Sequence, residues 1–151
     1  MRETRALYRP PYHGAVVFDL DDEELALLQS AFDLARHGDV AQLLPLVKAG
    51  LPVNLTNGTG DTLLLLAAYH DHPDLVSALL AHGADTARVN DRGQTALAAA
   101  VFRRSTAGVQ ALLQSGADPA LGERSAYAIA TFFDLPDMLA LLGSSTDHQE
   151  P

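Results

Sequence analysis

Histidine and carboxylate side chains gather in one short stretch of the sequence, where they could hold a metal ion. The segment YHDHPD contains His70, Asp71, His72 and Asp74, and His82 follows further along. A zinc site needs three or four such ligands that converge on one point. His70 and His72 are two residues apart, whereas side chains that meet on one helix face are separated by three or four. The spacing favours structural or solvated histidines, and a small metal-dependent hydrolase using His70, His72 and Asp74 is the weaker alternative.

The other residue types that carry catalysis stand in patterns typical of structure. No serine lies in a strand–turn–helix elbow of the kind that presents a nucleophile, and the sequence has no glycine-rich phosphate-binding loop. The acidic run Asp21–Glu24 is typical of the first turn of a helix, where carboxylates interact favourably with the helix dipole. The absence of cysteine excludes a thiolate nucleophile or metal ligand. We therefore predict that the protein is not an enzyme and binds no cofactor or metal.

Composition and charge narrow the setting and the partners. The 151 residues are 48% hydrophobic and 19% charged, which is typical of a folded chain. The net charge of −9 argues against nucleic acid or an anionic membrane as the main partner. The longest apolar run, Leu63–Tyr69, is too short to span a bilayer, and the N-terminus lacks the apolar region of a signal peptide. These features predict a soluble, cytoplasmic protein.

An internal repeat indicates which elements position these residues. The segment LLAHGAD (Leu79–Asp85) recurs as LLQSGAD (Leu112–Asp118), and LVKAGLP, beginning at Leu46, has the same phase. The glycines that mark this phase are Gly50, Gly83 and Gly116, each 33 residues after the last, and a second pair, Gly60 and Gly93, has the same spacing. Two landmarks with one period predict a stack of similar supersecondary units.

The two central units, Asn57–Val89 and Asn90–Leu121, resemble the ankyrin repeat. The residues that match its pattern in the first unit are Asn57, Gly60, Thr62, Leu64, Ala67, Ala68, His72, Val76, Leu79, Leu80, Gly83, Ala84 and Asp85. Those in the second are Gly93, Thr95, Leu97, Ala100, Val109, Leu112, Leu113, Gly116, Ala117 and Asp118. The resemblance implies an all-α solenoid of stacked helix-turn-helix units with short hairpin loops, in which His72 ties adjacent turns. More loosely, the whole chain is similar to small bacterial ankyrin proteins, which implies no activity.

The same residues make physical sense without the resemblance. Thr62 and Thr95 precede short apolar segments and can cap the helices there through their hydroxyl groups. Pro73 and Pro136 stand where a second helix begins and a backbone N–H needs no partner. Gly60 and Gly93 end turn tetrads in which the last residue takes a positive φ angle.

The ends of the stack differ from its middle, because a terminal repeat has one face without a neighbour. We predict repeats at 22–56, 57–89, 90–121 and 122–143, of which the first and last act as caps. Residues 1–21 form a basic arm, since the chain up to Val17 carries +2 and the remainder −11. This arm either packs on the first repeat or engages a partner. The polar segment 144–151 is predicted to be a disordered tail.

The resemblance also implies where a partner binds. Ankyrin proteins typically bind other proteins on a concave face formed by hairpin tips and by the ends of the first helices. Carried over by position, the candidate contacts are Arg36, His37, Thr59, Asp61, Tyr69, His70, Asp91, Arg92, Gln94, Phe102, Arg103, Phe132 and Phe133. Tyr69, Phe102 and Phe132 occupy one equivalent position in three successive repeats.

Two interpretations of this aromatic row stay open. An exposed row would be an apolar groove that anchors a protein partner, which the acidic repeats suggest is basic. A row whose rings pack on one another, or against a second copy of the chain, would instead have a structural or oligomerising role. We favour the first interpretation, in which the protein is a monomeric protein–protein interaction module.

Overall fold

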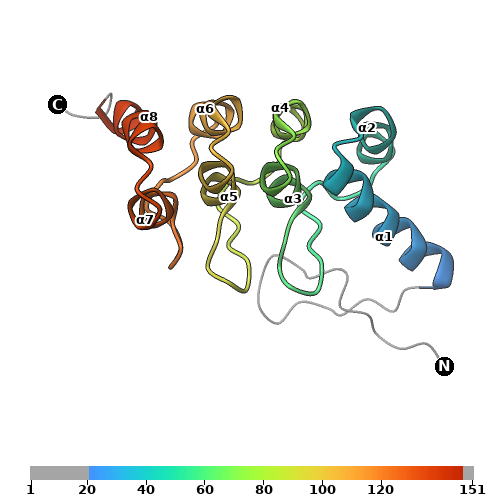
Figure 1. Cartoon of the computed structure of the whole chain (residues 1–151). Helices are drawn as coiled ribbons and strands as arrows, with labels where there is room; N and C mark the ends of the chain where they lie inside the picture. Colours follow the sequence, from blue (N-terminus) through green and yellow to red (C-terminus); the bar gives the residue numbers. More distant parts are fainter. Residues whose placement is uncertain (1–20, 148–151) are drawn as a thin grey trace.

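The computed structural model describes residues 21–147, and within them the chain forms only helices and the loops that join them (Figure 1). The helices are α1 (Asp22–His37), α2 (Val40–Lys48), α3 (Leu63–Tyr69), α4 (Pro73–Ala81), α5 (Ala96–Phe102), α6 (Thr106–Gln114), α7 (Ala126–Phe132) and α8 (Pro136–Asp147). A single antiparallel bridge between Thr56 and Thr62 is the one β-type pairing in this part of the chain. The predicted all-α solenoid is therefore confirmed.

The helices form two parallel rows. The inner row consists of α1, α3, α5 and α7, and the outer row consists of α2, α4, α6 and α8, with each helix contacting its neighbours along the row. Each inner helix also contacts the outer helix that follows it. Figure 1 shows the loops before α3 and α5 extending away from both rows, so that loops and inner helices enclose an angle. We call the surface made by these loops and the C-terminal ends of the inner helices the inner face.

The inner helices are apolar on nearly every side because they are enclosed by neighbours. Six of the seven residues of α3 are buried, and so are six of the seven residues of α5. Leucines fill α3, whereas α5 contains four alanines, which let the adjacent helices approach closely. Helices that are hydrophobic all round are stable only in such an interior position. The core therefore runs as one continuous cluster from α1 to α8.

Polar side chains fix where these short helices begin. The hydroxyl oxygens of Thr62 and Thr95 accept hydrogen bonds from the backbone N–H of the third residue onward, at 3.0 and 3.1 Å. These caps confirm the prediction from the sequence. Ser125 caps α7 in the same way, and Asp21 forms a reciprocal capping box with Glu24 at the start of α1.

The turn between the two helices of each repeat uses a left-handed residue. Gly38 has φ of 71° after α1, and the corresponding residues of the later repeats are Asp71, Arg104 and Asp134, with φ of 61°, 55° and 54°. A Cβ atom at Gly38 would lie 2.5 Å from the Cγ atom of His72, so only glycine fits in the first repeat. The later repeats accept a side chain in this conformation at some cost in backbone energy.

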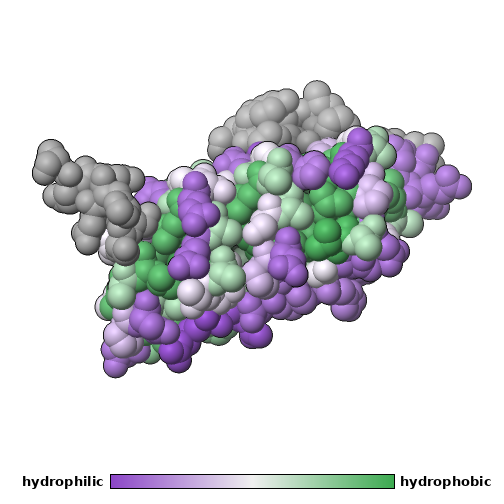
Figure 2. Space-filling view, turned by 90° about the horizontal axis from the view of Figure 1, so that it is seen from above, coloured by the Kyte–Doolittle hydropathy of each residue, from purple (hydrophilic) through white to green (hydrophobic). Residues whose placement is uncertain are grey.

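The outer row presents a different surface. Figure 2 views the molecule from this side and shows hydrophobic residues in columns separated by hydrophilic ones. The half-buried leucines of the outer helices, Leu80, Leu113 and Leu139, pack against the core, and exposed residues such as Asp74, Gln110 and Asp137 stand between them. Among residues 21–147, no helix is long and apolar enough to cross a membrane.

One predicted boundary at the end of the chain is wrong. Helix α8 continues to Asp147, so residues 144–147, expected to be part of a disordered tail, are helical. The chain has no glycine or proline between Gly143 and Asp147 that would end the helix earlier. The rest of that segment, 148–151, and the predicted basic arm up to residue 20 lie outside the described residues.

Candidate functional site

The hairpin loops are held mainly by buried side chains, and the bridge between Thr56 and Thr62 closes the first of them. The side-chain oxygen of Asn57 accepts hydrogen bonds from the N–H groups of Thr59 and Asp61, at 3.0 and 2.9 Å. Asn90 does the same for Arg92 and Gln94 one repeat later, at 2.9 Å each. Side chains that imitate a backbone turn in this way fix the loop without a partner strand.

Asp61 links the two hairpins and is the one predicted contact residue that lies in the interior. Its side chain is only 7% exposed, and its carboxylate accepts a hydrogen bond of 2.8 Å from the amide of Asn90. The same carboxylate accepts a second bond from the hydroxyl of Thr59. The expectation that Asp61 stands at an exposed hairpin tip is wrong, because the charge-assisted bonds of the turn draw it inward. Its role is to join successive loops, which also share a backbone bond from Asp91 to Thr59.

The remaining predicted hairpin residues lie at or near the surface. Asp91 and Arg92 are exposed at the tip of the third repeat's loop, as is Thr59 in the second. Gln94 is half-buried, and its side-chain oxygen lies 3.4 Å from the amide nitrogen of Asn90. These side chains border the inner face.

His72 performs the structural task that the repeat pattern implies. Its Nε2 atom lies 2.7 Å from the backbone oxygen of Arg36, so the second repeat bonds to the end of α1. In the described part of the chain, no three His, Asp or Glu side chains are placed to hold a metal ion. The arrangement of His72 gives no support to the hydrolase alternative, since its ring nitrogen is engaged by the backbone.

The aromatic row is exposed, and its rings also contact one another. The rings of Tyr69 and Phe102 are stacked, with centroids 6.0 Å apart and planes 2° from parallel. Phe102 meets Phe133 edge-on at 5.5 Å. Exposed fractions are 36% for Tyr69, 41% for Phe102 and 47% for Phe133. One interpretation of the sequence predicted exposed rings and the other predicted rings that pack on one another. The structure shows both features together.

The third member of the row differs from the one expected. Phe132 ends α7 as Tyr69 ends α3 and Phe102 ends α5, so its backbone position is equivalent. Its ring, however, is 81% exposed and contacts Phe133 at 4.9 Å. Phe133, one residue later, supplies the ring that touches Phe102. From here on, the aromatic row means Tyr69, Phe102 and Phe133.

His70, next to the first member of the row, lies near several basic side chains. The ring of His70 meets that of Tyr69 edge-on at 5.2 Å. Partial burial lowers the pKa of His70 below its usual value, and neighbouring basic side chains lower it further. In order of effect these are His72, Arg36, Arg103 and His37. The two arginines are therefore close enough to His70 to repel its proton.

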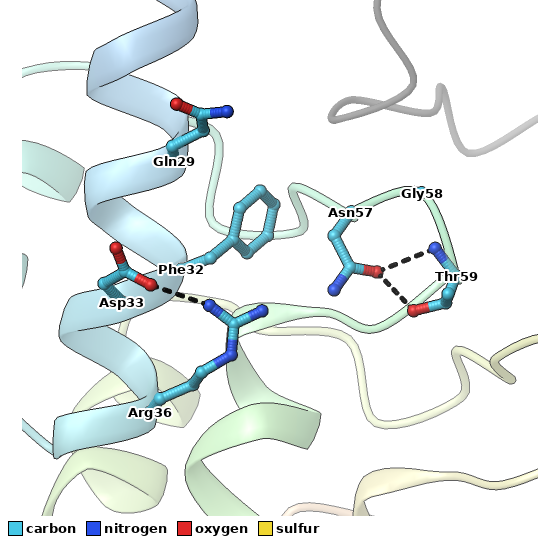
Figure 3. A pocket seen from close by; sticks show the side chains of 7 residues that line it. All are labelled: Gln29, Phe32, Asp33, Arg36, Asn57, Gly58 and Thr59. Atoms are coloured by element: carbon cyan, nitrogen blue, oxygen red, sulfur yellow. Dashed lines mark hydrogen bonds and ion pairs between the residues drawn. The ribbon is translucent and has the colours of Figure 1, made fainter.

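A polar hollow lies at the end of the inner face next to α1. It has a volume of about 530 Å³, and Figure 3 shows it between α1 and the loop that carries Asn57, Gly58 and Thr59. Phe32 forms its apolar wall, and Arg36 reaches across it while bonded to Asp33 at 2.9 Å. We call it the N-terminal hollow.

An apolar hollow lies at the other end. It measures about 350 Å³ and is lined by Arg124, Ala128, Ile129, Phe132 and Phe133. We call it the C-terminal hollow. Phe133 belongs both to this hollow and to the aromatic row, so the row leads directly into it.

Several residues that line these hollows were not among the predicted contacts, namely Gln29, Phe32, Asp33, Arg124, Ala128 and Ile129. The register of the helix-capping residues predicts the position of Arg124. Thr62, Thr95 and Ser125 begin equivalent helices, so the residue before Ser125 corresponds to Gln94. Counting back from the cap, rather than from the glycines, would have placed Arg124 on the inner face.

Stacked pairs of antiparallel helices, joined by loops that lie to one side, define a helical repeat protein. The sequence profile of ankyrin repeats, in three copies, matches residues 28–122. The chain therefore belongs to the ankyrin repeat family.

Two curated proteins illustrate the relationship. A protein of Pseudomonas aeruginosa named as an ankyrin repeat protein, PA3287, is 48% identical over 58 residues, which cover 38% of this chain and 34% of the relative. The human ankyrin repeat domain-containing protein 29 is 41% identical over 64 residues, covering 42% of this chain and 21% of that protein. The matched regions thus span about a third and a fifth of these relatives, and the similarity concerns the repeats. Repeats of this family generally bind other proteins.

Proposed function

We propose that this protein is a non-catalytic interaction module that binds another protein on its inner face. The observation that carries the proposal is the aromatic row, because three contacting rings of large hydrophobic residues stand exposed on an otherwise polar rim. A folded chain gains free energy by burying such rings, at about 25 cal/mol per Å² of apolar surface. Rings that stay exposed in a contiguous group are typical of binding surfaces.

Preorganisation supports the same proposal. The row sits at the ends of helices that are buried on nearly all sides, and the hairpins beside it are fixed by the bonds of Asn57, Asp61 and Asn90. A rigid surface loses little conformational entropy on binding, so more of the contact energy appears as affinity. We propose further that the protein acts as a monomer in the cytoplasm.

The test compares the wild type with a Tyr69→Ser/Phe102→Ser/Phe133→Ser variant as baits in a pull-down from the source cell. A Leu27→Ser variant is the matched control, because Leu27 is a similarly exposed hydrophobic residue, 45% exposed, on α1. We expect the wild type and the control to recover the same proteins and the triple variant to lose them. Equal recovery by all three baits would contradict binding at the inner face.

Sedimentation velocity separates this proposal from the oligomerising alternative. If the row is buried between copies of the chain, the wild type will sediment as a larger species at higher concentration and the triple variant will not. We expect one monomeric species for both proteins across the micromolar range.

A further inference from the structure

The inner face holds a larger share of the basic residues than the rest of the molecule does. Downstream of Val17 the chain holds 7 basic and 18 acidic residues. Four of the basic ones, Arg36, Arg92, Arg103 and Arg124, lie on the hairpins, at the ends of the inner helices or in the two hollows. At physiological ionic strength, charges more than about 8 Å apart are largely screened. A bound partner therefore responds to these nearby arginines more than to the net charge of −9.

Three of these arginines, Arg92, Arg103 and Arg124, lack an internal counterion in the described part of the chain. Arg36, by contrast, is paired with Asp33, Arg88 with Asp85 and Arg104 with Asp137. The charged groups that act on His70 beside the row are all basic. Arg103, next to the middle ring of the row, and Arg124, in the C-terminal hollow, are thus available to an external carboxylate.

The geometry of the row limits the shape of the partner. Its rings follow one another at 6.0 and 5.5 Å, a span that about three to four residues of extended chain would cover. At one end the row opens into the C-terminal hollow, whose volume of about 350 Å³ is of the order needed for a bulky apolar side chain and whose walls are Ile129, Phe132 and Phe133. At the other end it approaches His70 and Arg36, beside the N-terminal hollow.

From this juxtaposition we infer that the partner is an extended, acidic protein segment, with a bulky aromatic or aliphatic residue that enters the C-terminal hollow and carboxylates that face Arg103 and Arg124. The inference rests on the proposed function and adds the chemistry of the partner. It replaces the expectation of a basic partner, which followed from net charge alone. Although aromatic faces also attract cations, a cationic segment would meet the arginines and His70 along the whole row.

The first experiment selects peptides from a phage-displayed library of random twelve-residue sequences. The wild-type protein is the target, and peptides that also bind the Tyr69→Ser/Phe102→Ser/Phe133→Ser variant are removed. We expect the remaining peptides to carry a net negative charge and at least one large hydrophobic residue. Remaining peptides that are basic would overturn the inference and leave the proposed function intact. Failure to obtain any peptide that depends on the row would count against both.

The second experiment measures affinity for the strongest selected peptide, synthesised with tryptophan as its bulky residue. The protein itself contains no tryptophan, so fluorescence reports the peptide alone. We expect Arg103→Gln to weaken binding at least fivefold, and Arg88→Gln, which removes the same charge from a residue paired with Asp85, to change it less than twofold. Equal losses in the two variants would show a response to net charge only and would contradict the inference. Circular dichroism checks that both variants remain folded.

Discussion

The hairpin bases and the aromatic row are a few residues apart in each repeat, yet they reverse the usual distribution of polar and apolar groups. At the hairpin bases, the polar side chains of Asn57, Asp61 and Asn90 are buried. In the row, the large hydrophobic rings of Tyr69 and Phe102 are exposed. Buried polar groups and exposed apolar patches are the two departures from ordinary burial that carry information.

The difference between the two regions is one of task. Every buried polar atom described at the hairpin bases has a hydrogen-bond partner, so that region contributes to the stability of the fold. The rings of the row contact one another, but part of the surface of each ring stays exposed to solvent. Substitutions in the first region should therefore lower the free energy of unfolding, and substitutions in the second should mainly lower affinity for a partner.

Asp61→Ala should have the largest effect on stability. It removes the acceptor for the buried amide of Asn90 and for the hydroxyl of the more exposed Thr59. We expect a loss of about 3 kcal/mol in the free energy of unfolding, measured by urea denaturation. Asp61→Asn keeps one oxygen in place and should lose less. A variant that unfolds like the wild type yet fails to bind peptide would show that Asp61 belongs to the binding surface after all.

Gly38→Ala should be the next most damaging substitution. Its Cβ would lie 2.5 Å from His72, and a φ of 71° is unfavourable for alanine, so we expect a loss of about 2 kcal/mol. Asp71→Gly at the same place in the next repeat should instead stabilise the protein by about 0.5 kcal/mol, because glycine accepts φ of 61° without strain. Thermal and urea unfolding measure both. Effects of the same sign would contradict the assignment of these two positions as equivalent.

The two regions also differ in how far the sequence alone could predict them. The 33-residue period, the capping threonines and the glycine turns predicted the helices and their caps, and the resemblance to the ankyrin repeat implied the role of His72. The burial of Asp61 was not predicted, because it depends on a bond to Asn90, 29 residues away. Likewise, the contact of Phe102 with Phe133 rather than with Phe132 is a tertiary contact that the repeat register does not predict.

The same limit applies to the charge of the site. Net charge is a property of the composition, and it suggested a basic partner. The position of Arg124 depends on the trimmed final hairpin, where the glycine landmarks lose their register and only the capping Ser125 keeps it. The sequence already predicted that Arg36, Arg92 and Arg103 lie on this face, and the structure added Arg124 to them.

Phe102→Ser should separate binding from stability. The ring is 41% exposed, so its loss should lower the free energy of unfolding by about 1 kcal/mol, less than Asp61→Ala. Because Phe102 is the middle ring of the row, the same substitution should weaken peptide binding at least tenfold. Titration of the tryptophan peptide and urea denaturation on one preparation measure the two quantities. If stability fell more than for Asp61→Ala while affinity held, the proposed division of tasks would be wrong.

The smallest effect we expect is a dependence of stability on pH through His70. Because burial and the neighbouring basic groups lower the pKa of His70 in the folded state, the unfolded chain binds a proton first as the pH falls. The contribution of the neutral imidazole is therefore present above the unfolded value of 6.5 and is lost as the pH falls from there through the lowered folded value.

His70→Gln should remove that part of the acid sensitivity, a few tenths of a kcal/mol once solvent screening is included. Urea midpoints at pH 7.5 and 5.5 for the wild type, His70→Gln and His82→Gln test this, with His82 as the control because its ring bonds the backbone of its own helix at Ala78.

The affinity for an acidic peptide should depend on pH in the opposite direction. Bound carboxylates raise the pKa of His70, so affinity should rise as the pH falls from 7.5 to 5.5 in the wild type and change less in His70→Gln. Affinity that fell on acidification would mean that the groups meeting His70 in the complex are cationic, and the row would then recognise the opposite kind of segment.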